Sequence, residues 1–90
     1  MRYHADPPAM RRTVPLDGMT LIYHRPSGMT HIVAEPVPEI LEALGQGPAD
    51  TATLLARLAE RHGVESGAEA EAAVAARLSE LEAVGLVARA

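Results

Sequence analysis

The pattern of apolar and polar positions changes near Pro36, which divides the chain into a part with β character and a part with helical character. Before Pro36, short stretches rich in β-branched and other apolar residues alternate with turn residues, which is typical of strands joined by tight turns. The stretches predict three strands, over residues 12–16, 20–24 and 29–33. Asp17-Gly18 and Arg25-Pro26-Ser27-Gly28 favour tight turns between them, because glycine supplies the positive φ that such turns need. The sequence therefore predicts a three-stranded antiparallel meander with strand 20–24 in the middle.

The two turns also fix which residues of the predicted sheet share a face. If residue 24 faces residue 29, then 22 faces 31 and 21 faces 32, and successive side chains alternate between the faces. One face then carries Ile22, His24, Met29, His31 and Val33. The other face carries Leu21, Tyr23, Thr30 and Ile32. Neither face is polar throughout, so we expect helices to cover one face and another body to lie near the other.

Three segments after Pro36 have the apolar period of an amphipathic helix. They predict helices that begin at Pro36 or Pro38, at Asp50 or Thr51, and at a Ser66-x-x-Glu69 capping box, and that end at Gly45, Gly63 and Gly85. The third helix is the longest, and its predicted core stripe consists of Val74, Leu78, Leu81 and Val84. The helical part is therefore expected to form a three-helix unit joined by short connections.

The two ends of the chain show no such periodicity. Residues 1–11, which include Pro7-Pro8, predict a flexible N-terminal arm, and Leu86–Arg89 predicts an extended tail. Ninety residues suffice for one small domain, which we place at residues 12–90. The predicted fold class is α+β, a winged helix-turn-helix-like domain with a three-stranded antiparallel meander followed by three helices.

The composition restricts the core and the partners. Phe and Trp are absent, so the core must be aliphatic and thin, and the absence of Cys excludes disulfides, thiolate metal sites and a cysteine nucleophile. A net charge of −4 argues against general affinity for nucleic acid or an anionic membrane. The longest apolar run covers residues 72–76, far below the ~20 residues of a membrane span, and the first residues do not form a signal peptide. We expect a cytoplasmic protein without a cofactor.

The outer strands of the predicted sheet leave main-chain N–H and C=O groups unpaired. Pro15 removes a donor from the first strand, whereas strand 29–33 contains no proline, glycine or charged residue. The third strand is therefore suited to receive an added strand from a partner. Two alternatives stay open for this edge: the tail at residues 86–89 covers it, or two copies of the chain associate or exchange elements to form a homodimer.

The last predicted helix supplies the other wall of such a site. Its positions off the core stripe are Ala70, Ala73, Arg77 and Glu80. Small alanine side chains let a neighbouring backbone approach closely, and Arg77 could pair with a carboxylate of an acidic guest. The alternative is that the alanines only favour the helix, and that Arg77 pairs with Glu80 at i,i+3.

The residues from Leu21 to Ile32, Leu-Ile-Tyr-His-Arg-Pro-Ser-Gly-Met-Thr-His-Ile, resemble the hairpin of PqqD-like proteins, especially those of HPr-kinase-related A systems. Residues 39–44, 54–59 and 78–87 are similar to the three helices and the closing Gly-Leu of that family, and the likeness covers roughly residues 12–88 except at 34–38. The resemblance implies a winged-helix-like domain that binds the leader segment of a ribosomally synthesised precursor peptide. Such a domain presents the peptide to modifying enzymes and does no chemistry itself. The residues expected to bind the peptide are Met29, Thr30, His31, Ile32, Val33, Ala70, Ala73, Val74, Arg77 and Leu81.

Three other functions agree less well with the sequence than peptide binding does. A winged-helix DNA-binding regulator has the same outline, but residues 68–84 carry four glutamates and only Arg77, a net charge of −3 that disfavours phosphate contacts. His24 and His31 share a sheet face, but zinc would need further ligands, for which only Glu35 and His4 are near in sequence. No nucleophile motif or phosphate-binding glycine loop is present, so we do not expect an enzyme.

Overall fold

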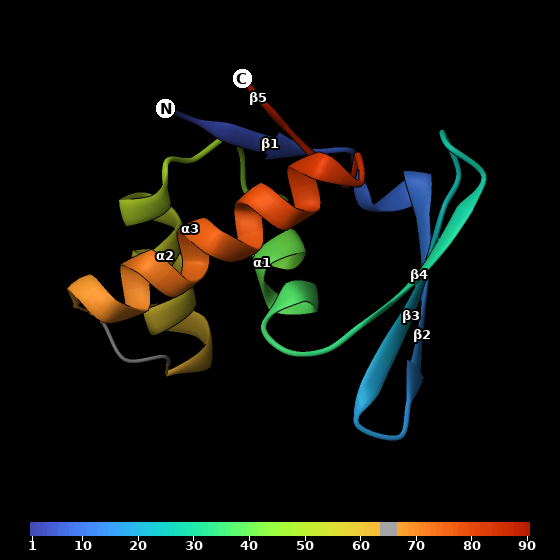
Figure 1. Cartoon of the computed structure of the whole chain (residues 1–90), viewed down its shortest axis with the longest axis horizontal. Coiled ribbons are helices and arrows are strands. Elements are labelled where there is room, and N and C mark those ends of the chain that lie inside the picture. Colours follow the sequence, from blue (N-terminus) through green and yellow to red (C-terminus); the bar gives the residue numbers. More distant parts are fainter. Residues whose placement is uncertain (64–66) are drawn as a thin grey trace.

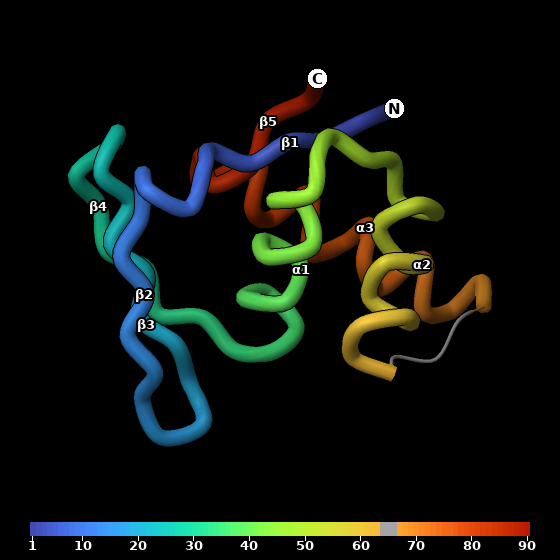
Figure 2. The backbone as a smooth tube through the Cα atoms, turned by 180° about the vertical axis from the view of Figure 1, so that it is seen from behind, coloured from blue at the N-terminus to red at the C-terminus, as the bar shows by residue number. Residues whose placement is uncertain are grey.

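The three predicted strands form an antiparallel sheet that stands at one side of the helices (Figures 1 and 2). The structure is a computed structural model, and it describes residues 1–63 and 67–90 of the chain. The sheet consists of β2 (Arg11–Leu16), β3 (Met19–His24) and β4 (Met29–Val33), in that order. The helices are α1 (Val37–Leu44), α2 (Thr51–His62) and α3 (Ala68–Ala83). The chain is therefore a small α+β domain, the class that the sequence predicted.

The register of the sheet agrees with the register predicted from the turns. The pairs between β3 and β4 include His24–Met29, Ile22–His31 and Leu21–Ile32. Ile22 and His24 on the inner face are only 1% and 5% exposed, whereas Tyr23 and Ile32 on the outer face remain exposed. The inner face therefore contributes to the core, and the outer face is open.

The hydrogen-bond phase of the sheet determines which main-chain groups of β4 point outward. Bonded and non-bonded residue pairs alternate along an antiparallel ladder. The two-residue turn between β2 and β3 fixes the phase, and so does the bond from the Arg25 N–H to the Met10 carbonyl at 2.8 Å. The main-chain groups of every second residue of β3 therefore form hydrogen bonds with β2, and those of the residues in between form hydrogen bonds with β4. On β4 this leaves the N–H and C=O groups of Thr30 and Ile32 pointing away from the sheet.

The same phase explains how β2 accommodates a proline. Pro15 pairs with Thr20, and this pair falls at a non-bonded position of the β2–β3 ladder. The missing N–H of Pro15 would point outward, so the proline removes no bond from the sheet. It does remove one donor from the outer edge of β2, as the sequence predicted.

The helices begin and end close to the predicted residues. Asp50 caps α2, because its carboxylate accepts a hydrogen bond from the Thr53 N–H at 2.7 Å. Gly63 ends α2 in the left-handed conformation with φ of 65°, where a side chain would be strained. The residue before α3 is Gly67, and the predicted capping residue Ser66 lies outside the described residues.

One aliphatic core joins the helices to the inner face of the sheet. Its largest fully buried side chains are Ile22, Ile40, Leu41, Leu54, Leu58 and Leu78. The predicted α3 stripe is buried at Val74, Leu78 and Leu81. The prediction is wrong at Val84, which is 47% exposed. The reason is that α3 ends at Ala83 and Val84 has left the helical path, with φ of −100° and ψ of 3°.

The prediction that residues 1–11 form a flexible arm outside the domain is also wrong. Tyr3–Ala5 forms β1, which pairs antiparallel with β5 (Val87–Arg89) in a second sheet. Tyr3 is buried, and its N–H and C=O groups bond the main chain of Ala49 at 2.8 and 3.0 Å. Sequence pattern misses this pairing because three residues are too few to show a period of two, and because the partner strand lies at the opposite end of the chain.

His24 ties the N-terminal segment to the start of β4. Its Nε2 lies 2.8 Å from Asp6 Oδ2, and its Nδ1 lies 2.8 Å from Ser27 Oγ. Ser27 Oγ also accepts a hydrogen bond from the Met29 N–H at 3.3 Å. These bonds satisfy a buried polar ring, which would be costly without partners. From Asp6 the chain continues through the short 3₁₀ helix η1 (Pro8–Met10) into β2, so both outer strands of the sheet are held at this end.

Replacing Asp50 with alanine is expected to lower the melting temperature by a few degrees, because the Thr53 N–H loses its acceptor. The same hydrogen bond lowers the pKa of Asp50 below its ordinary value of 3.8. A carboxylate with a lowered pKa stabilises the folded state above that ordinary value, and this contribution is lost as the pH falls further. Thermal melts of the two proteins at neutral pH and well below pH 3.8 measure the effect. A gap of the same size at both pH values would show that the charged cap is unimportant.

Candidate functional site

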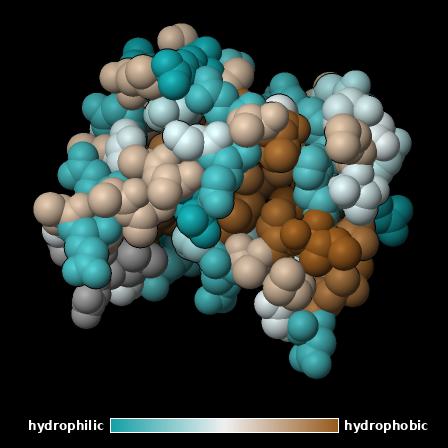
Figure 3. Space-filling view, in the orientation of Figure 1, coloured by the Kyte–Doolittle hydropathy of each residue, from teal (hydrophilic) through white to brown (hydrophobic). Residues whose placement is uncertain are grey.

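A hollow of about 460 Å³ lies between β4 and α3, and we call it the edge groove. Its lining comes from β4, from the segment that follows β4, from α1, from α3 and from the residues after α3. These residues are Thr30, His31, Ile32, Val33, Ala34, Glu35, Val37, Arg77, Glu80, Leu81, Val84 and Leu86. Figure 3 shows hydrophobic side chains gathered between α3 and the three-stranded sheet, where the surface is hollowed.

The lining of the edge groove is largely apolar and partly open. Val84 is 47% exposed, whereas Leu81 and Leu86 are buried, and Ile32 borders the groove from the outer face of the sheet, where it is 62% exposed. Each Å² of apolar surface that a partner covers contributes about 25 cal/mol to binding before the costs of association. The edge groove therefore offers a place where a few apolar side chains of a partner can leave water.

The unpaired edge of β4 borders the same groove. In the part of the chain that the structure describes, β4 pairs with β3 alone. The C-terminal residues pair with β1 instead, so the alternative in which residues 86–89 cover this edge is wrong. The outward N–H and C=O groups of Thr30 and Ile32 are thus available to a further strand.

Arg77 and Glu80 form an ion pair on the α3 wall of the groove. Arg77 Nε lies 2.8 Å from Glu80 Oε2, which is an ion-pair distance, although the two groups lack the alignment of a hydrogen bond. This is the i,i+3 pairing that the sequence left as an alternative, and pairs of this kind contribute only about 0–1 kcal/mol. Because Glu80 already neutralises Arg77, this wall does not present a free cation to an acidic guest.

His31 places an unpartnered polar atom beside the groove. Its Nε2 is buried and has no hydrogen-bond partner among the described residues. A buried polar atom without a partner costs about 1–3 kcal/mol. A guest that bonds this nitrogen would therefore remove an existing cost as well as add a contact.

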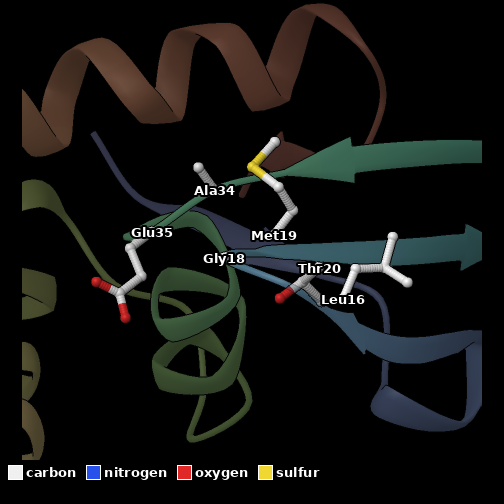
Figure 4. A pocket seen from close by; sticks show the side chains of 6 residues that line it. All are labelled: Leu16, Gly18, Met19, Thr20, Ala34 and Glu35. Atoms are coloured by element: carbon white, nitrogen blue, oxygen red, sulfur yellow. The ribbon is translucent and has the colours of Figure 1, made fainter.

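A second hollow of about 490 Å³ lies where the turn between β2 and β3 approaches the segment after β4, and we call it the end pocket (Figure 4). It is lined by Leu16, Gly18, Met19, Thr20, Ala34 and Glu35. Met19 points from β3 toward Ala34, and the carboxylate of Glu35 points away from the sheet (Figure 4). Ala34 and Glu35 line both hollows, so the end pocket continues the edge groove beyond the last residue of β4.

The structure brings together only part of the predicted peptide-binding set. The predicted residues that line the edge groove are Thr30, His31, Ile32, Val33, Arg77 and Leu81. The others lie apart from this lining: Met29 and Ala73 are exposed, Val74 is buried in the core, and Ala70 packs against the core. The groove is thus lined by the C-terminal half of α3, and the prediction extended it too far toward the N-terminus of this helix.

The sequence pattern predicts other roles for two of the groove residues. Val84 continues the helical period, which predicts a place in the core stripe, and Leu86 falls in the predicted tail. Gly85, with φ of 81°, separates them and turns the chain from α3 toward β5. The signal that could have found them is this glycine, because a stripe residue next to a helix-ending glycine has no further turn of helix to bury it.

The described residues do not form a metal site. Within residues 1–63 and 67–90, no group of three or more His, Asp or Glu side chains could hold a metal ion. Asp6, His24 and Ser27 are the residue types of a hydrolytic triad, but Ser27 Oγ accepts a hydrogen bond from the Met29 N–H and so helps to form the turn before β4.

No helix in this part of the chain is long and apolar enough to cross a membrane.

No family model, curated protein or solved structure matches this chain. The resemblance to PqqD-like proteins and the DNA-binding alternative therefore both stay predictions.

Proposed function

We propose that this domain binds an extended peptide by adding it as a strand to β4, with the edge groove receiving the side chains on one face of that peptide. The observation that supports this most directly is that an unpaired strand edge and an apolar hollow share the same residues, Thr30 to Val33. In strand addition, main-chain bonds supply affinity, and pockets for alternate side chains supply specificity.

The register of β4 defines how such a guest would lie. Guest side chains opposite His31 and Val33 would face the groove, and those opposite Thr30 and Ile32 would lie on the open outer face of the sheet. An ordered guest loses about 1–2 kcal/mol of conformational entropy per residue. Four main-chain bonds and two buried side chains offset this cost only moderately, so we expect micromolar affinity, about −8 kcal/mol.

We further propose that the guest is the leader segment of a ribosomally synthesised precursor peptide. The support is the resemblance of residues 12–88 to PqqD-like proteins, together with the free edge of β4, the strand that its composition predicted to receive an added strand. In this role the domain would be winged-helix-like, non-catalytic and cytoplasmic, and it would present the peptide to a modifying enzyme of the same gene system.

Titration of the ¹⁵N-labelled domain with peptides encoded beside its gene tests this proposal. The amide resonances of Thr30 and Ile32 are expected to shift most and to gain protection from hydrogen exchange, because their N–H groups acquire acceptors. Amides of α2, which lies away from the groove, serve as an internal control. Shifts centred on α2, or no shift with any such peptide, would refute strand addition.

DNA binding has no comparable support among the described residues. The helix that would enter a groove of DNA is acidic at its first turn, with Glu69 and Glu71, and its arginine is paired with Glu80. Phosphate contacts need clustered free cations. A mobility shift with duplex DNA at low salt would revive this alternative.

A further inference from the structure

We infer that the segment bound at β4 carries opposite charges at its two ends, a basic residue toward Glu35 and an acidic residue toward Arg25. This inference rests on the proposed function and adds the chemistry by which β4 would choose its guest. It follows from the charges at the two ends of the strand edge, which differ in sign.

The end of β4 that leads into α1 is negative. Glu35 lines both the edge groove and the end pocket, and no ion pair or hydrogen bond engages its carboxylate in residues 1–63 and 67–90. Asp17 lies in the turn between Leu16 and Gly18, two residues of the end pocket, and adds a second carboxylate. The basic residue that lines the edge groove, Arg77, is held by Glu80.

The opposite end of β4 is positive. Arg25 lies in the turn that leads into Met29, and Arg12 lies on β2 near the same end of the sheet, in register with Tyr23. Neither arginine forms an ion pair within the described ranges. The carboxylate of Asp6 at this end accepts a hydrogen bond from His24, and its charge is balanced by the nearby guanidinium of Arg11, which leaves Arg12 and Arg25 without a partner carboxylate among the described residues. A guest strand therefore meets uncompensated positive charge here.

The two ends are far enough apart to act separately. Met29–Val33 spans about 13 Å at roughly 3.3 Å per residue, and Arg25 and Glu35 lie beyond its two ends. The distance between these charges therefore exceeds the screening length of about 8 Å at physiological ionic strength. A guest of about seven residues reaches both ends, and each of its terminal charges meets mainly one end of β4.

Charge is needed here because the main-chain bonds do not choose a register. Thr30 and Ile32 would bond any backbone in either direction, and the Ala34 carbonyl already accepts the Val37 N–H at 3.0 Å, so the ladder cannot extend past this point. Opposite charges at the two ends would disfavour a guest that is reversed or shifted by two residues. Because antiparallel pairing is the more stable, we expect the basic residue to precede the acidic residue along the guest.

Selection from a displayed library of random twelve-residue peptides tests the inference. One target is the unchanged domain, and the other is the double variant Arg25→Glu with Glu35→Arg. Peptides selected on the unchanged domain are expected to carry Lys or Arg several positions before Asp or Glu, and to bind about tenfold more weakly when the two charges are exchanged. The double variant is expected to select the reverse order. The control is the double variant Arg2→Glu with Glu69→Arg, which exchanges the same charges at exposed positions outside the groove. It should select peptides with the same charge order as the unchanged domain does.

The outcomes separate this inference from the proposed function. Every selected peptide is tested again on Ile32→Pro, which removes a donor from the edge. The charge inference is wrong if the selected peptides fail to bind this variant but show no charge order, or show the same order on both targets. Strand addition would stand in that case. If no selected peptide depends on Ile32, or if no peptide is selected, strand addition and the charge inference both fail.

Discussion

Replacing Leu78 with alanine is expected to destabilise the domain by about 2–5 kcal/mol. Leu78 is 0% exposed and lies in the middle of α3, among the side chains that join the helices to the sheet. The change removes buried methyl groups and leaves a cavity that an aliphatic core without large aromatic side chains cannot easily refill. A domain of this size has only about 5–15 kcal/mol of stability, so the loss is a large fraction. We expect the melting temperature to fall by roughly 10–30 °C.

Val84→Ala is the matched control for this substitution. Val84 follows Leu78 and Leu81 in the apolar period but is 47% exposed, so its truncation should cost less than about 1 kcal/mol. Urea unfolding of both variants at one temperature measures the difference. If both substitutions lowered the free energy of unfolding equally, the face of α3 that packs against the core would differ from the one in the structure.

Replacing Ile32 with proline is expected to weaken peptide binding by about 10- to 100-fold while leaving the fold intact. The proline removes a donor from the bound ladder and leaves a guest carbonyl without its partner, which together cost about 1.5–3 kcal/mol. In the free domain the Ile32 N–H points away from β3, so its removal breaks no bond of the sheet. Isothermal titration with a peptide that binds the unchanged domain provides the measurement.

Thr13→Pro supplies the control on the other edge of the sheet. Thr13 pairs with Ile22 at a non-bonded position of β2, so its N–H also points outward, as that of Pro15 would. This variant should retain full affinity, because the proposed site of strand addition is β4 and not β2. If both proline variants bind the peptide equally well, the guest does not use the β4 edge.

The parts of the fold that sequence pattern predicted are those specified by neighbouring residues. Asp17-Gly18 fixes the first hairpin and, with it, the register of β2 on β3, because a two-residue turn allows few pairings. Asp50 and Gly63 mark the ends of α2 through their own backbone and side-chain chemistry. In each case the determining interaction spans only a few residues, so it is visible in the sequence.

The parts that escaped prediction depend on residues far apart in the chain. The pairing of β1 with β5 joins the first residues to the last ones, and the bond from His24 to Asp6 joins a strand to an irregular segment 18 positions earlier. Neither contact leaves a periodic trace in the sequence. The candidate site shows the same division: the β4 edge was predicted from its composition, whereas Val84 and Glu35 join the site only through the path of the chain around it.

The pairing of β1 with β5 also bears on the order in which this domain can fold. Tyr3–Ala5 cannot find its partner until residues 87–89 have been made, and contacts between such distant positions form slowly. Leu86, which lines the edge groove, is held in place next to this late contact. During synthesis on the ribosome the helices and the hairpins can therefore form first, and the edge groove is expected to be completed only when β5 docks.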